Sequence, residues 1–246
     1  MKRLSPLLVL GLACGFLGFT SAPQQKPANS ADLDAVLKKM DAVAAIFRST
    51  QADFEWEKYE RVIDEVDDVQ TGTIYYRRTG KEIEMMAEVR KDGPSADSMK
   101  EEPKYVLFKG GKIQMFLPKL NQVTEKDLGK NRQEFETYLV LGFGGSGEDL
   151  QKEFDVTYVG PEKIDGVATA HLSLAPKSQS VRNTFQQIDL WIDLDKGISK
   201  QQKFINPQGD YRLAKYSDIQ VNGKKIPDEV FKLRTNGKTQ FVSPTG

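Results

Sequence analysis

The stretch VLFKGGKIQMFLP, residues 106–118, has the pattern of two short strands joined by a Gly-Gly turn. Successive side chains of a strand point to opposite faces, so a sheet wetted on one face alternates between apolar and polar residues. Here apolar side chains fall on both faces: Val106 and Phe108 oppose Tyr105 and Leu107, and Phe116 opposes the row Ile113, Met115 and Leu117. The hairpin therefore predicts a sheet with apolar contacts on both faces.

Similar two-residue periodicity continues from Ala52 nearly to the end of the chain. We expect strands at 52–62, 70–78, 82–90, 104–109, 112–117, 121–125, 154–160, 167–175, 185–194, 199–206, 210–220 and 229–234, separated by turns such as NPQGD and VNGK. No long helical segments lie between these strands, which predicts antiparallel pairing. The fold class is mainly β with some α: one large, curved antiparallel sheet.

Helical periodicity is clearest before the first strand, over residues 31–48. Apolar side chains recur there at three- and four-residue spacing, with charges on the opposite face: Leu33, Val36, Leu37, Met40, Val43, Ala44 and Phe47. A second helical stretch, KNRQEFETYLVLGF, interrupts the strands, and SGEDLQKEF follows it as a shorter helix with Ser146 at its N-cap. We therefore expect an N-terminal amphipathic helix and a short helical insertion.

The first residues have the layout of a secretory signal. Lys2 and Arg3 precede an apolar stretch that ends near Phe19, and small residues follow up to Ala22. We expect a signal peptide at 1–22, a flexible leader at 23–30 and a single exported, soluble domain at 31–246. The only cysteine, Cys14, falls within the signal; its lipidation is the alternative, which Gly11 and the continuing apolar stretch disfavour.

Composition excludes several classes of function. The 35 basic and 35 acidic residues balance, so no net charge draws the chain to nucleic acid. One histidine, His171, and no cysteine outside the signal leave too few ligands for zinc or copper. We expect no metal, no cofactor and no enzymatic activity.

Two motifs are better explained as structural. The glycines of GFGGSG, 142–147, fit a phosphate-loop spacing but follow a helix in an antiparallel protein, so we interpret them as a flexible loop. His171 has no nucleophile elbow near it, and we expect a structural histidine. What remains is a surplus of aromatic and Met side chains in the strands, which either fill a core or line a cavity for an apolar ligand.

Several stretches in order carry a resemblance to a known family. Five stretches resemble the LolA family of outer-membrane lipoprotein carriers. They are FRSTQADFEWEKYE, QTGTIYYRRTG, VLFKGGKIQMFLPKLNQVTEKDL, VTYVGPEKIDGVATAHLSLAPK and the closing run from QIDLWIDLDKG to PDEVFKL. The resemblance covers residues 32–242. It implies an incomplete antiparallel β-barrel closed by helices that act as a lid, with an apolar hollow for the acyl chains of lipoproteins.

The resemblance also implies a place and partners. It implies a monomeric periplasmic protein that accepts acylated lipoproteins from an inner-membrane ABC transporter and passes them to an outer-membrane receptor. An anchored receptor or an envelope-stress sensor of the same fold is the alternative. The arginine that latches the lid in this family matches Arg78, whereas Thr79 replaces the usual proline and Met85 stands where an aromatic residue is expected.

Together, the resemblance and the apolar pattern predict the residues of the hollow and lid. They are Leu33, Val36, Leu37, Met40, Val43, Phe47, Phe54, Trp56, Ile74, Tyr76, Met85, Ile113, Met115 and Leu117. Transfer of a sixteen-carbon chain to water costs about 13 kcal/mol at about 0.8 kcal/mol per methylene. Burial of the apolar face of helix 31–48 returns roughly 10–20 kcal/mol. We hypothesise that this helix fills the empty hollow and swings aside on loading.

Overall fold

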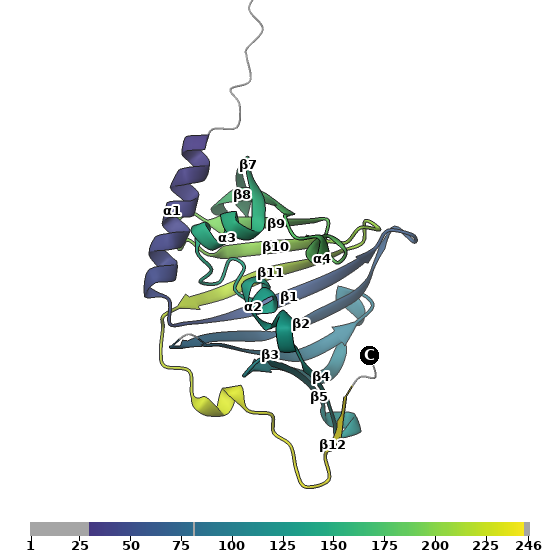
Figure 1. Cartoon of the computed structure of the whole chain (residues 1–246). Helices are drawn as coiled ribbons and strands as arrows, with labels where there is room; N and C mark the ends of the chain where they lie inside the picture. Colours follow the sequence, from purple (N-terminus) through teal and green to yellow (C-terminus); the bar gives the residue numbers. More distant parts are fainter. Residues whose placement is uncertain (1–29, 81, 244–246) are drawn as a thin grey trace, which may run out of the picture.

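The computed structural model describes residues 30–80 and 82–243, and the predicted signal peptide and most of the leader lie outside them. Its centre is one twelve-stranded sheet in the order β12-β6-β5-β4-β3-β2-β1-β11-β10-β9-β8-β7 (Figure 1). Two antiparallel meanders, β1–β6 and β7–β11, join where β1 pairs with β11. The predicted antiparallel, curved and unclosed sheet is therefore confirmed.

Eleven of the twelve expected strands are present, with bounds close to those predicted. They are β1 (Ser49–Glu60), β2 (Glu65–Thr79), β3 (Glu82–Gly93), β4 (Lys100–Lys109), β5 (Lys112–Leu117), β6 (Gln122–Asp127), β7 (Phe154–Ile164), β8 (Val167–Pro176), β9 (Gln187–Asp193), β10 (Ser199–Ile205) and β11 (Tyr211–Val221). The expected strand at 229–234 is wrong, because the chain forms the 3₁₀ turn η4 (Asp228–Phe231) there. The last strand is instead β12 (Gln240–Val242), which pairs parallel with β6.

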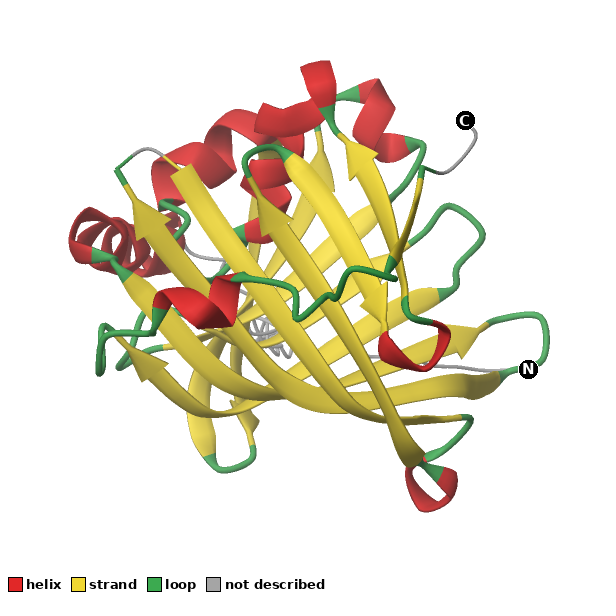
Figure 2. Ribbon diagram, turned by 90° about the horizontal axis from the view of Figure 1, so that it is seen from below, coloured by secondary structure: helices red, strands yellow, loops and turns green. Residues whose placement is uncertain are grey.

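Helices gather on one face of the sheet, which we call the inner face (Figure 2). They are α1 (Ser30–Ile46), α2 (Arg132–Leu139), α3 (Gly147–Glu153) and the short α4 (Gln179–Arg182). Both helices of the predicted insertion are present, and the Ser146 hydroxyl caps α3 by accepting a 3.0 Å hydrogen bond from the Asp149 amide. The 3₁₀ turns η1 (Ala96–Ser98), η2 (Pro118–Leu120) and η3 (Gly129–Asn131) lie in connections.

Helix α1 packs beside the hollow, against α3 and β7, and this position corrects the expectation that it fills the hollow. Val36, Leu37 and Met40 are buried there among side chains of β7, β8 and β9. Two glycines permit this close packing. A Cβ at Gly147 would lie 2.7 Å from the Leu37 Cβ, and one at Gly197 would lie 2.8 Å from a Val43 methyl carbon.

A segment that we call the strap, residues 222–239, crosses the opposite, outer face of the sheet. Its Phe231 and Ile226 bury Met86 and Leu107 of β3 and β4. This contact explains the two-faced pattern of the 106–118 hairpin. Val106 and Phe108 face the inner core, whereas Leu107 packs under the strap.

Arg77 of β2 fastens the strap. Its Nε donates a 2.8 Å hydrogen bond to Glu84, its Nη1 binds Asp228 of η4, and its guanidinium lies 4.3 Å from the centre of the Phe231 ring. Burial of Glu84 opposes ionisation, but its hydrogen bonds to Lys109 and Arg77 hold its pKa below the ordinary value. A paired, ionised Glu84 thus helps to hold the strap.

Candidate functional site

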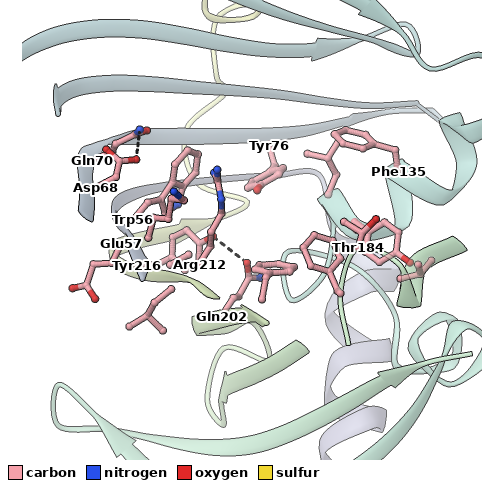
Figure 3. Close-up of a pocket in the computed structure, with 18 of the residues that line it drawn as sticks. Trp56, Glu57, Asp68, Gln70, Tyr76, Phe135, Thr184, Gln202, Arg212 and Tyr216 are labelled. Atoms are coloured by element: carbon pink, nitrogen blue, oxygen red, sulfur yellow. Dashed lines mark hydrogen bonds between the residues drawn. The ribbon is translucent and has the colours of Figure 1, made fainter. Parts of the chain in front are cut away.

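A cavity of about 670 Å³ lies on the inner face, between the sheet and helices α2 and α4 (Figure 3). Apolar and aromatic side chains make up much of its wall: Trp56, Tyr76, Leu128, Phe135, Tyr138, Leu139, Val181, Phe185, Phe204, Leu213, Ala214 and Tyr216. This volume lies within the range of about 300–1,000 Å³ that is typical of small-molecule pockets. The cavity is therefore large enough for an apolar ligand.

The loop after α2 plugs the neighbouring part of the hollow. Phe143 is fully buried, stacks on Tyr76 with ring centres 5.1 Å apart, and meets Tyr216 edge-on at 4.6 Å. We call residues 141–144 the plug. Sequence analysis did not assign Phe143 to the site, although the apolar run YLVLGF was a signal that could have placed it there.

One backbone hydrogen bond and one polar network tie the plug to β10. The Ser199 amide donates a 2.7 Å bond to the Gly142 carbonyl, and the Gln202 amide group donates to the Leu141 carbonyl. The Tyr216 hydroxyl in turn donates a 3.0 Å bond to Gln202. Burial raises the pKa of Tyr216, so this hydroxyl stays protonated as the donor of the network.

The plug requires glycine where it passes α1. Gly144 has φ +88°, and a Cβ there would lie 2.4 Å from the Phe47 ring. A Cβ at Gly142, with φ +73°, would lie 1.9 Å from the Ser199 hydroxyl. The GFGGSG segment is thus a tightly packed turn, which corrects its interpretation as a flexible loop.

Arg78 joins the plug to α1. One guanidinium nitrogen donates a 3.1 Å hydrogen bond to the Ala44 carbonyl at the end of α1, and the other donates a 3.0 Å bond to the Gly144 carbonyl. The guanidinium also lies 5.4 Å from the centre of the Phe47 ring. A single side chain of β2 therefore holds the two helical parts of the inner face together.

The register of β11, β1 and β2 grades the wall of the cavity from polar to apolar. Paired residues of neighbouring strands share a face, so they form rows across the sheet. Three rows meet the cavity: Arg212, Lys58 and Asp68 form the one nearest to the β1–β2 turn; the next is Ala214, Trp56 and Gln70; and the third is Tyr216, Phe54 and Gly72. Figure 3 shows Asp68, Gln70 and Glu57 together at one end of the cavity and Phe135 at the other.

The residues predicted for the hollow and lid fall into four groups, of which the last is the β5 row. Trp56 and Tyr76 line the cavity. Phe47, Phe54, Ile74 and Met85 are buried in the cluster around Phe143, where the ring of Phe54 stacks on Trp56 at 4.1 Å. Leu33, Val36, Leu37, Met40 and Val43 belong to α1 and are not among the residues that line the cavity, so their part in the hollow and lid stays a prediction.

The predicted inner row of β5 lies on the inner face but outside the cavity wall. Ile113 packs against the Phe143 cluster, Leu117 is half-buried, and Met115 remains 36% exposed. Arg212, Phe185 and Phe204 were missed by sequence analysis. They lie at the cavity because of the strands that pair with theirs and because of the position of α4. Neither the pairing nor that position can be predicted from the residues next to them in sequence.

The described residues were also compared with the requirements of a metal site and of a membrane-spanning helix. No group of three or more His, Cys, Asp or Glu side chains there could hold a metal ion. None of the described helices is long and apolar enough to span a membrane. His171 lies on the outer face, stacked on Trp191 at 4.4 Å and 2.8 Å from a Glu162 oxygen.

The fold and the cavity define a class of protein: an open, curved antiparallel sheet that half-encloses an apolar hollow beneath a helical insertion. No protein-family model and no curated protein matches the sequence. Solved structures do. An uncharacterized conserved protein from Thermus thermophilus matches with a TM-score of 0.53 and 12% identity, over 87% of this chain and 99% of that one.

MucB matches with a TM-score of 0.51 and 15% identity, over 87% of this chain and 66% of its own. A LolA superfamily protein from Nitrosomonas europaea matches with a TM-score of 0.38 and 16% identity, over 82% and 97% of the two chains. At these identities the likeness concerns the fold.

Proposed function

We propose that the protein is a periplasmic carrier that binds the acyl chains of lipoproteins, or of other lipids, and delivers them from the inner to the outer membrane. The observation that carries the proposal is the cavity of about 670 Å³, walled by aromatic and aliphatic side chains under a helical insertion. Burial of a sixteen-carbon chain there avoids a cost of about 13 kcal/mol in water. No catalytic step is needed for this role.

The cavity volume indicates how much of a lipid fits without rearrangement. If a methylene group takes about the 30 Å³ that a water molecule takes in the liquid, a sixteen-carbon chain fills about 480 Å³. The cavity accepts one such chain, whereas a triacylated lipoprotein requires further space. Outward movement of Phe143 and α2 is the simplest source of that space, because the plug occupies the adjoining hollow.

Arg78 then acts as the latch of the lid. Its hydrogen bonds to Ala44 and Gly144 favour the closed arrangement, and release of the plug breaks them. The energy of the latch is of the order of a few kcal/mol, which is smaller than the gain from chain burial. Loading and unloading therefore need no nucleotide at this protein. The partners proposed are an inner-membrane lipoprotein-releasing ABC transporter and an outer-membrane lipoprotein receptor, with the carrier monomeric.

The test combines native mass spectrometry of protein isolated from a bacterial periplasm without detergent with titration by a fluorescent acyl probe. Ala214→Trp places a large ring in the cavity wall and is expected to abolish probe binding. Ala175→Trp makes the same change at an exposed position of β8 and should bind as the wild type does.

Lipid or lipoprotein adducts that are absent from the Ala214→Trp protein support the carrier. Mass adducts on Cys14 itself would indicate an anchored receptor of the same fold. A clean apo mass and equal probe binding by both variants would overturn the carrier proposal and favour a sensor that binds a protein partner.

A further inference from the structure

The graded wall of the cavity distinguishes the two ends of a bound amphiphile. The row formed by Tyr216, Phe54 and Gly72 is buried, whereas Arg212, two rows away, is exposed. Alternate residues of a strand lie about 7 Å apart, so charged and apolar rows are separated by about 14 Å along β11. A bound lipid thus has one orientation in which its polar head lies beside the charged row and its acyl chain lies along the apolar row.

At the polar end of the cavity, some charged side chains have a protein partner and others do not. Lys58 binds Glu60 and Asp67, and the Glu57 carboxylate at the same end binds Lys215. Asp68 accepts a 2.9 Å hydrogen bond from Gln70. Within the described residues the Arg212 side chain has neither an ion pair nor a hydrogen bond, and the same is true of Lys126, which lines the cavity from β6.

A cation without a protein partner, at the polar end of an apolar cavity, fits an anionic head. A guanidinium presents paired N–H donors that match two phosphate oxygens, and such charge-assisted pairs are strong. The uncharged diacylglyceryl group of a lipoprotein offers no anion to this row. The charge of the row thus discriminates between classes of lipid that the apolar wall alone cannot distinguish.

We propose that the cavity takes one acyl chain of a phospholipid, with the phosphate on Arg212 and that chain along Trp56 towards Tyr216 and Phe135. The proposal deepens the carrier function and rests on it. Lys126 adds positive potential from the other side of the opening, and Asp68 opposes an anionic head. Arg212 is therefore the residue that selects the head, and the aromatic wall retains the chain.

Three probes separate the parts of this proposal: lysophosphatidic acid with a sixteen-carbon chain, the uncharged monoacylglycerol with the same chain, and inorganic phosphate. Binding is measured by isothermal titration below the critical micelle concentration. We expect the wild type to bind the phosphate amphiphile at least about tenfold more tightly than the neutral one, as hydrogen bonds to charged groups allow. We expect Arg212→Gln to remove this preference, mainly by weaker binding of the phosphate amphiphile.

Two further variants sharpen the test. Asp68→Asn should increase the preference for the phosphate amphiphile over the neutral one. Arg234→Gln removes the same charge from an exposed position of the strap and should behave as the wild type. Higher salt should weaken binding of the phosphate amphiphile alone.

Equal affinity for both amphiphiles in the wild type would overturn the head-group site and leave the carrier function standing. Inorganic phosphate that binds as tightly as the amphiphile would overturn the lipid assignment in favour of a free-anion site. Failure of both amphiphiles to bind would refute the carrier function itself.

Discussion

Replacement of Arg78 by methionine tests whether one side chain holds the insertion closed. Methionine keeps an unbranched apolar side chain of similar length but has no donor for the Ala44 and Gly144 carbonyls. The two hydrogen bonds are part-buried and come from a charged group, so each contributes about 1.5 kcal/mol at the low end of its range. Loss of the contact with the Phe47 ring adds about 0.5 kcal/mol.

The sum, about 3.5 kcal/mol, opposes mainly the local opening of the plug. Since 1.36 kcal/mol is a factor of ten, amides that exchange through this opening should exchange roughly 400 times faster in Arg78→Met. The Ser199 amide, bonded to Gly142, and the Gly145 amide, bonded to Val140 at 3.1 Å, are the reporters. Hydrogen exchange followed by NMR resolves both.

Arg182→Met is the matched control. Arg182 also donates to backbone carbonyls, those of Pro176 at 3.0 Å and Lys177 at 2.6 Å, but both lie beside it in sequence. The control should leave exchange of the plug unchanged. Wild-type exchange at Ser199 and Gly145 in Arg78→Met would show that Arg78 does not hold the plug, and it would refute the latch.

Three further outcomes are expected. Phe143→Ala should lower the free energy of unfolding by about 3–5 kcal/mol, since it empties a fully buried site, yet raise the number of acyl chains bound; denaturant unfolding and native mass spectrometry measure the two effects, and unchanged lipid capacity would contradict the plug. Gly144→Ala should destabilise the protein by more than about 1 kcal/mol, because it adds left-handed strain to a clash; a melting temperature equal to that of the wild type would contradict this. The folded pKa of Glu84 is lowered, so its stabilising contribution is present above the unfolded value near 4.3 and is lost as the pH falls through the folded pKa; opening of the strap, measured by hydrogen exchange corrected for the intrinsic rate, should therefore increase below about pH 4 in the wild type and depend less on pH in Glu84→Gln, where the Asp228 carboxylate on Arg77 still titrates.

The strands were predictable because their signal is local. Alternation along β1–β11 depends on residues two positions apart, and eleven of the expected strands have bounds close to those found. The 229–234 segment also alternates, but there Phe231 docks on the outer face of the sheet and the chain turns as η4. Tertiary contact overrides the pattern at that point.

The candidate site was less predictable, for a different reason. Amphipathic periodicity showed that Met40 is buried but not against what, and the structure places it beside the hollow rather than in it. Arg212 faces the cavity because it pairs with Lys58, which lies 154 positions earlier in the chain. Pairing between strands so far apart leaves no mark in either strand alone.

The strap has a consequence for how the chain is made. Synthesis and export both run from the N-terminus, so β3 and β4 are complete long before residue 226 emerges. Until then Met86 and Leu107 have no cover on the outer face, and β6 remains an unpaired edge without β12. Contacts between segments so far apart in sequence form slowly compared with the contacts of a hairpin. The nascent sheet thus passes through a stage that is prone to aggregation, and chains shortened before residue 226 stay in it.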